Sequence, residues 1–256
     1  MRPVTPAHKP VCMARFLLLQ LRPETEASDD EYHAFLDKGG LAEGQVRRIR
    51  LDREALPEDL DPADYAGVIV GGGPGCVSDA PQDKDPVEAR IEAACLSLMP
   101  KITGADIPFM GCCYGIGILA HHLGAEVSKK RFGEPAGAVT CHLTDDGRRD
   151  PLTATLPEQF DAFVGHKEAV QHLPNGAVHL LSSAPCPYQM IRYGENVYAT
   201  QFHPEADARG FAARIRIYRH KGYFAPETAD DLIAMCHEAD VTQPQRLLAA
   251  FVTRYA

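Results

Sequence analysis

The chain has 256 residues, of which 45% are hydrophobic and 24% are charged, a composition typical of a soluble globular protein with a full core. Its formal net charge is −9 and it contains no long basic run, which argues against binding to DNA or RNA phosphates. It shows no signal-peptide pattern and no stretch of the roughly 18 apolar residues that a membrane-spanning helix needs. We therefore expect a cytoplasmic protein that binds neither nucleic acid nor membrane.

The cysteines do not form a metal-binding pattern. There are eight, and none belongs to a C-x-x-C pair, so the spacing typical of zinc sites is absent. In a chain without export signals, reduced thiols are a better interpretation than disulfides. Most are therefore expected to be small buried side chains, and we expect neither a metal nor an organic cofactor.

Strands and helices are predicted to alternate in the first half of the chain, after a flexible arm at residues 1–13. Ser28 and Glu31 form a capping box that predicts the start of one helix, and Asp85 followed by proline predicts the start of another. Short apolar runs predict strands at 16–21, 65–70 and 107–110, residues 46–51 are a further candidate strand, and a third helix is expected to end at 123. This alternation favours a parallel sheet covered by helices on both faces.

The second half is predicted to be richer in short strands. These are expected at 137–143, 161–165, 178–182, 188–192 and 197–202, and helices are expected at 207–219, 227–238 and 243–255. No linker is long enough to separate two domains. We therefore expect an α/β fold with an open, mostly parallel sheet, helices on both faces and a small antiparallel strand region. Residues 14–225 would form the domain and 226–256 a helical extension of it.

The sequence GCCYG at 111–115 lies between a predicted strand and a predicted helix. This is the setting of a nucleophile elbow, whose sharp turn requires small residues two positions before and after the nucleophile. Glycines hold both positions around Cys113, whereas Cys112 would have bulky residues there, so Cys113 is the candidate nucleophile. A helix N-terminus and a nearby imidazolium favour the thiolate, so we expect a lowered pKa for Cys113. The pattern alone is also compatible with two buried cysteines at a tight turn.

A candidate base, His203, ends the apolar strand 198–202. Pro204 restricts the backbone of His203, and Glu205 is close enough in sequence to accept the second imidazole N–H. Such a hydrogen bond fixes the tautomer and stabilises the imidazolium. The segment alone would equally describe an exposed histidine before a helix-capping glutamate, but the elbow upstream favours the catalytic interpretation.

The glycine loop GGGPG at 71–75 follows another predicted strand. No G-K-[ST] follows, and Cys76 stands where G-x-G-x-x-G requires its last glycine, so neither nucleotide-binding pattern is matched. A backbone N–H of this loop can instead point at a developing oxyanion, with the N–H of Tyr114 as the second donor. A plain tight turn is the alternative.

These motifs, in this order and spacing, resemble the class I glutamine amidotransferase domain, particularly that of GMP synthase. They are GGGPG at 71–75, GCCYG at 111–115 and QFHPE at 201–205, and the resemblance runs from about residue 45 to about residue 220. It implies a flavodoxin-like fold in which Cys113 attacks the amide carbon of glutamine, His203 transfers protons and Glu205 orients His203. Ammonia leaves, and water hydrolyses the γ-glutamyl thioester.

The resemblance also implies that the N–H groups of Gly73 and Tyr114 hold the oxyanion. Further residues are candidates for substrate contact: Gly72, Gly117, His166 and Gln201.

Two departures from the family pattern concern substrate recognition. The family commonly has glutamine where this chain has Gly117, and its Ser-His-Gly-Asp stretch is here the sequence GHKE at 165–168. His166 either contacts substrate or is a solvated loop residue.

Three functions are compatible with these residues. The first is an amidase that supplies ammonia to a separate synthetase, because this sequence lacks the S-G-G-x-D-S loop of the GMP synthase ATP-pyrophosphatase domain. The second is a stand-alone hydrolase of another γ-glutamyl amide, which the altered recognition residues favour. The third is a non-catalytic binding protein on the same fold, which the three intact candidate residues disfavour.

Overall fold

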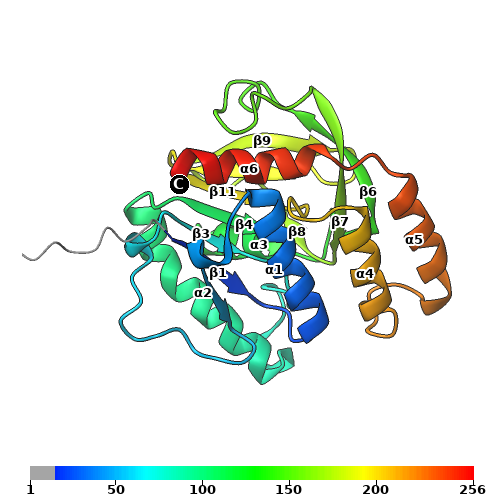
Figure 1. Cartoon of the computed structure of the whole chain (residues 1–256), viewed down its shortest axis with the longest axis horizontal. Helices are drawn as coiled ribbons and strands as arrows, with labels where there is room; N and C mark the ends of the chain where they lie inside the picture. The colour runs from blue at the N-terminus through cyan, green and yellow to red at the C-terminus, as the bar shows by residue number, and fades with distance from the viewer. Residues whose placement is uncertain (1–14) are drawn as a thin grey trace, which may run out of the picture.

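The computed structural model describes residues 15–256, and its centre is a nine-stranded mixed sheet (Figure 1). The strands are β1 Phe16–Gln20, β2 Val46–Arg50, β3 Gly67–Val70, β4 Phe109–Cys112, β5 Val127–Ser128, β6 Glu134–Leu143, β7 Gln159–His166, β8 Ala169–Val170, β9 Ala177–Ser183, β10 Met190–Tyr193 and β11 Val197–Thr200. The helices are α1 Thr25–Gly39, α2 Pro86–Gly104, α3 Tyr114–His122, α4 Ala208–Tyr218, α5 Ala229–Glu238 and α6 Gln243–Tyr255, with short 3₁₀ turns at Glu43–Gln45, Pro62–Asp64, Pro81–Asp83 and Pro226–Thr228.

The sheet has a parallel half and an antiparallel half. Its strand order is β2-β1-β3-β4-β11-β10-β9-β6-β7, in which the first five strands are parallel and the remaining pairs are antiparallel. Strands β5 and β8 form a separate antiparallel pair. The expected α/β architecture is confirmed, and β1, β3 and β4 are the buried, mainly apolar strands typical of the interior of such sheets.

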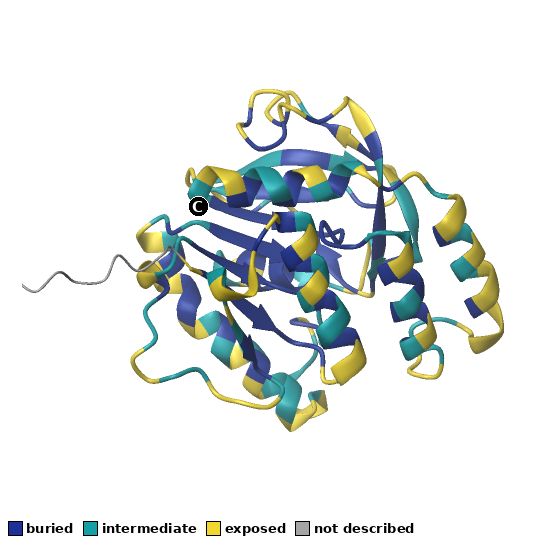
Figure 2. Cartoon of the chain, viewed as in Figure 1, coloured by how far each residue is buried: buried dark blue, intermediate teal, exposed yellow. Residues whose placement is uncertain are grey.

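Helices cover both faces of the sheet because successive strand side chains point to opposite sides. Leu17 and Leu19 of β1 belong to the hydrophobic cluster that contains α2 and α3, whereas Phe16 and Leu18 belong to the cluster that contains α1 and α6. Figure 2 shows the buried strands at the centre, with the exposed residues of the helices facing outward. Helices α4 and α5 lie side by side beyond the antiparallel half and share a third cluster with Phe163 of β7.

The predicted start of the first helix was wrong. Helix α1 begins at Thr25, and Ser28 lies buried inside it, where its hydroxyl donates to Gln20 Oε1 at 3.1 Å. Glu31 accepts hydrogen bonds from the Arg22 guanidinium at 3.0 Å and the Gln20 amide at 2.9 Å. The two polar residues of the apparent capping box therefore belong to a buried network.

The C-terminal helix α6 packs against α1, with Leu247 and Phe251 fully buried. We propose that 226–256 extends the domain formed by 14–225, because α6 completes the core on that face. The predicted arm at 1–13 lies outside the described residues.

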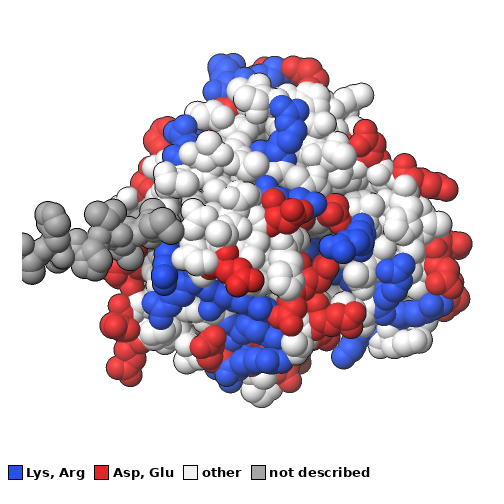
Figure 3. Space-filling view, viewed as in Figure 1, with Lys and Arg blue, Asp and Glu red and all other residues white. Residues whose placement is uncertain are grey.

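The surface carries mixed charge over the face shown in Figure 3, where acidic and basic side chains are interspersed. Within 15–256, no helix combines the length and apolar character needed to cross a membrane. The seven cysteines in this part of the chain are all free thiols, and all are buried.

Candidate active site

The three sequence motifs converge because they follow three neighbouring parallel strands. Strand β4 pairs with β3 on one side, where Val70 lies opposite Gly111, and with β11 on the other, where Cys112 lies opposite Thr200. The carboxyl ends of parallel strands meet at one edge of a sheet, which is where ligands bind in open α/β folds. The Cys113 N–H donates to the Thr200 carbonyl at 2.8 Å, which ties the elbow directly to the end of β11.

The elbow has the strained backbone of a sharp strand-to-helix turn. Cys113 has φ 54° and ψ −92°, a conformation that costs a non-glycine residue about 1–3 kcal/mol. A Cβ on Gly111 would lie 2.8 Å from the carbonyl carbon of Gly115, so position 111 accepts only glycine while the turn keeps this shape. Cys112 is completely buried in the hydrophobic core, whereas Cys113 lines a cavity.

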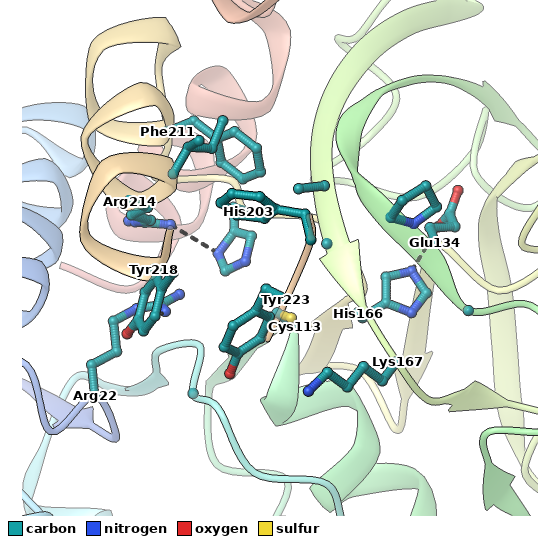
Figure 4. A pocket seen from close by; sticks show the side chains of 17 residues that line it. Arg22, Cys113, Glu134, His166, Lys167, His203, Phe211, Arg214, Tyr218 and Tyr223 are labelled. Atoms are coloured by element: carbon teal, nitrogen blue, oxygen red, sulfur yellow. Dashed lines mark hydrogen bonds and ion pairs between the residues drawn. The ribbon is translucent and has the colours of Figure 1, made fainter. Parts of the chain in front are cut away.

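His203 is held on both sides within the same cavity. Its backbone N–H donates to the Phe163 carbonyl at 3.1 Å, and its Nδ1 lies 3.0 Å from Glu205 Oε1. The Nδ1 contact leaves Nε2 as the ring nitrogen available for proton transfer. His203 and Cys113 both line the cavity (Figure 4), and Glu205 is fully buried behind them.

A buried arginine that the sequence analysis missed completes this group. Arg214 Nη1 lies 2.7 Å from Glu205 Oε1 and 3.1 Å from His203 Nδ1. Burial, reinforced by Arg214 and Arg22, lowers the pKa of His203 below its ordinary value, and Glu205 only partly opposes this. Burial alone would raise the pKa of Glu205, but Arg214 and His203 outweigh it and keep that pKa below the ordinary range.

The pKa expected for the candidate nucleophile was wrong in direction. Burial raises the pKa of Cys113 to about 12, and the nearby guanidinium groups of Arg22 and Arg214 do not offset it. The sequence pattern indicated a helix N-terminus but not how little water reaches the thiol, which is only 8% exposed. At neutral pH the resting pair is therefore a thiol beside a neutral imidazole.

The glycine loop passes close behind the imidazole. A Cβ on Gly72 would lie 2.6 Å from His203 Cε1 and 2.7 Å from Arg22 Nη2, so only glycine fits there. The Gly72 N–H donates to Glu31 Oε1 at 3.3 Å, and Gly72 lines neither this cavity nor the smaller recess that contains the other substrate-contact candidates. Gly73 lines the cavity beside Cys113.

Tyr114 is the first residue of α3, so its backbone N–H has no acceptor within that helix and is available to a ligand. Its ring is fixed separately, because the hydroxyl donates to Glu92 Oε2 at 3.0 Å.

A small recess adjoins the cavity at Cys113, with a volume of about 30 Å³, and Gly117 and Gln201 are among the residues that line it. The Glu168 carboxylate occupies the space beside Gly117, where it accepts the N–H groups of Val77 and Ser78 at 2.8 Å each. A Cβ on Gly117 would lie 3.2 Å from Glu168 Oε1. In this chain, the space of the family's usual glutamine side chain is therefore taken by a carboxylate from another segment.

His166 is buried at the end of β7, which excludes the solvated-loop alternative. Its Nδ1 lies 2.8 Å from the Glu168 carbonyl and its Nε2 lies 2.7 Å from Glu134 Oε2. Together with Cys186 these two side chains form the one group within 15–256 whose donor atoms suit a metal ion, all within 4.8 Å of one another. Glu134 is also bonded to Gln189 at 2.6 Å, so the arrangement is a closed polar network.

The main cavity has a volume of about 350 Å³ and joins residues from distant segments (Figure 4). The charged and aromatic lining residues that the sequence motifs do not include are Arg22, Glu134, Phe211, Arg214, Tyr218, Tyr223 and Phe224. Only Arg22 carries a local signal, since it follows a predicted strand at the edge where the motifs converge. Arg214 lies on a helix face that is otherwise apolar, and no sequence pattern marks it as functional.

Comparison with known proteins agrees with this geometry. The family model for glutamine amidotransferase class-I matches residues 32–216. Similar curated proteins include the GMP synthases [glutamine-hydrolyzing] of Thermosipho africanus, 31% identical over 184 residues, and of Thermomicrobium roseum, 33% identical over 168 residues. These matches cover 66% and 63% of this chain but only 31% and 28% of the relatives, so the chain spans about a third of their length.

Solved structures share the fold at lower identity. A glutamine amidotransferase from Thermotoga maritima superposes with a TM-score of 0.75 at 21% identity, covering 95% of this chain and 98% of that one. A second, from Methylobacillus flagellatus, gives a TM-score of 0.69 at 19% identity, covering 95% and 96%. Because the family model matches most of this chain, residues 32–216, the chain belongs to the class I glutamine amidotransferase family.

Proposed function

We propose that this chain hydrolyses a γ-glutamyl amide, glutamine or a close relative, through Cys113, His203 and Glu205. One observation carries the proposal: the elbow cysteine and the His-Glu pair follow adjacent parallel strands and meet at one cavity. Class I membership supports the same chemistry. The three intact side chains argue against a purely non-catalytic role.

In the proposed first step, Cys113 Sγ bonds to the amide carbon while its proton passes to His203 Nε2. The carbonyl oxygen becomes an oxyanion held by the N–H groups of Gly73 and Tyr114, and one such donor is commonly worth about 3 kcal/mol. His203 then gives the proton to the leaving nitrogen, and the C–N bond breaks to form a thioester. Water, deprotonated by His203, adds to the thioester carbon; the C–S bond then breaks, the acid is released and His203 returns the proton to the Cys113 sulfur.

The resting protonation states support a concerted start. Because burial raises the pKa of Cys113 to about 12 and the pKa of His203 is lowered, a preformed thiolate–imidazolium pair is disfavoured. We infer that proton transfer accompanies attack on the bound amide, when the developing charge moves onto the carbonyl oxygen. Glu205 then stabilises the imidazolium that forms.

The first candidate substrate is glutamine, with ammonia passed to a separate synthetase. The curated relatives are named glutamine-hydrolyzing GMP synthases, and this chain matches only about a third of their length. The ammonia acceptor would then lie outside these 256 residues. In this case glutaminase activity would rise when that partner binds.

The second candidate is a stand-alone hydrolase of another γ-glutamyl amide. The observation that favours it is the pairing of Gly117 with the buried Glu168, which remodels the recess beside the nucleophile. Such an enzyme would be active without a partner.

The proposal is tested by ammonia release from L-glutamine by the purified chain, compared with Cys113→Ser and Cys112→Ser variants. Loss of activity on the order of 10⁴-fold or more is expected for Cys113→Ser, because triad members act as a unit. Cys112→Ser changes a core residue one position away and should keep the activity of its folded fraction. Alkylation by the glutamine analogue 6-diazo-5-oxo-L-norleucine, located by mass spectrometry, should fall on Cys113. Equal activity in the two variants would refute the assignment.

A further inference from the structure

Two unequal spaces meet at Cys113. His203 lines the cavity of about 350 Å³ but not the adjoining recess of about 30 Å³. A water molecule needs roughly 10–15 Å³ of such space, so the recess holds about two or three waters at most. The large cavity has room for many more heavy atoms than an ammonia molecule.

The recess is small for a structural reason. Glu168 is 7% exposed and anchored by the backbone N–H groups of Val77 and Ser78, so its carboxylate is fixed beside Gly117. This side of the site therefore cannot widen without breaking two hydrogen bonds.

The chemistry decides which space receives the leaving group. If the proposed function holds, His203 must place a proton on the departing nitrogen, which therefore lies within hydrogen-bond reach of the imidazole. Because His203 lines only the large cavity, the substituent on that nitrogen extends into it.

The lining of the cavity is suited to an aromatic or bulky apolar group. Phe211 and Tyr218 of α4 face it, and Tyr223 and Phe224 from the following loop continue the same wall. The rings of Tyr218 and Tyr223 lie 5.2 Å apart between centroids, and Phe211 stacks on Phe163 at 4.6 Å. Such walls favour apolar substituents, since each buried aromatic group gains from leaving water and from ring contacts.

We propose, resting on the proposed function, that the preferred substrate is an N-substituted γ-glutamyl amide whose amine carries an aromatic or similarly bulky apolar group. The substituent occupies the cavity between α4 and β6. The C–N bond breaks to release the intact primary amine, which takes its proton from His203. The γ-glutamyl group stays on Cys113 until water releases it as glutamate.

The test compares three substrates on the same protein: L-glutamine, γ-glutamyl-methylamide and γ-glutamyl-benzylamide. The two substituted amides release primary alkylamines, so they differ chiefly in the apolar group. We expect kcat/KM for the benzylamide to exceed that of the other two by at least ~100-fold, the scale of discrimination that apolar pockets achieve.

A variant that narrows the cavity tests whether the preference for a bulky substituent depends on this cavity. Ala136 and Ala138 of β6 both pack against the cluster that contains α4 and α5, but only Ala136 lines the cavity. Ala136→Phe should lower the benzylamide-to-methylamide ratio at least ~10-fold, and Ala138→Phe should leave that ratio as it is. Circular dichroism and urea midpoints establish that both variants fold.

The outcomes separate this inference from the proposed function. Hydrolysis of glutamine or the methylamide at rates equal to or above the benzylamide would overturn the inference and leave the cysteine mechanism standing. If Ala136→Phe left the preference for the benzylamide intact, the placement of the benzyl substituent in this cavity would also be overturned. Failure to hydrolyse all three amides, with Cys113 unlabelled by the diazo analogue, would overturn both.

Discussion

The Arg214 guanidinium lies 2.7 Å from the Glu205 carboxylate, and through the same nitrogen it also reaches His203 Nδ1 at 3.1 Å. When Nδ1 carries the proton that it donates to Glu205, the positive charge of Arg214 faces that N–H. A positive charge at this distance opposes formation of the imidazolium. Arg214 is therefore a positioning residue that holds Glu205 and at the same time keeps His203 neutral.

Replacing Arg214 should change the pH dependence of the reaction. Arg214→Met removes the cation, so the pKa of His203 rises, and the acidic limb of the kcat/KM profile moves to higher pH because the base must be neutral. Arg214→Lys keeps a positive charge and should leave the limb near its original position. Arg22 and Glu205, the other charged groups that act on His203, are the same in both variants.

This comparison needs a folding control, because breaking a buried ion pair costs about 3–5 kcal/mol. Urea midpoints give the stability of each variant, and kcat/KM is corrected for the folded fraction. Identical acidic limbs in Arg214→Met and Arg214→Lys would show that the charge of Arg214 does not act on His203.

Gly72→Ala should impair catalysis by steric displacement of the base. The added methyl group would lie 2.6 Å from His203 Cε1, so the imidazole or the loop must move. Because a misplacement of about 1 Å at a reacting group can cost ~10²-fold, we expect a fall in kcat of that order. Gly44→Ala is the matched control, since its Cβ meets nothing within 4 Å. Equal kcat in the two variants would contradict this account of the loop.

Gly117 and Glu168 should be energetically coupled. Gly117→Gln forces a side chain into space held by the Glu168 carboxylate and should destabilise the fold by about 1–3 kcal/mol. Glu168→Ala leaves the buried Val77 N–H without an acceptor, at about 1–3 kcal/mol, and also removes the part-buried hydrogen bond from the Ser78 N–H. The double variant should lose less than the sum by about 0.5–3 kcal/mol, because the shortened residue vacates the contested space.

Urea unfolding of the four proteins measures this coupling. Gly104→Gln combined with Glu168→Ala is the control cycle, because a Cβ on Gly104 meets nothing within 4 Å. Strict additivity in both cycles would mean that Glu168 does not occupy the place of the missing side chain.

Cys113 should react slowly with iodoacetamide at neutral pH. Only the thiolate is alkylated, and with a pKa of about 12 its fraction keeps rising as the pH increases. The rate should therefore climb from pH 7 to pH 10 without a plateau, and Cys113→Ser should abolish this phase. A plateau reached below pH 8 would instead indicate a preformed thiolate–imidazolium pair.

The local motifs made much of the fold and the core of the site predictable from sequence. Apolar runs marked the strands of the parallel half, and the elbow spacing distinguished Cys113 from Cys112 before the structure placed Cys112 in the core. The predicted capping box was wrong because Ser28 and Glu31 have buried partners elsewhere. Both contact Gln20 of β1, and Glu31 also accepts the N–H of Gly72 in the glycine loop. A four-residue pattern carries no information about such distant partners.

The remaining site residues could not be predicted because their roles depend on contacts between remote segments. Arg214 reaches Glu205 from the next helix, and Glu168 reaches Val77 from 91 positions away. The raised pKa of Cys113 depends on burial by several elements at once. Sequence periodicity reports which face of an element is apolar, but not which polar groups meet across the finished core.

The pairing of β4 with β11 makes the site a product of late chain assembly. Phe109 and Val197, which lie opposite each other in this pair, are 88 positions apart (197 minus 109), and every strand from β5 to β10 lies between them in the chain. Contacts of such long sequence separation carry a large loop-closure entropy and form slowly. During refolding, catalytic competence should therefore lag behind helix formation, because the nucleophile and its base share a wall only after that pair has closed.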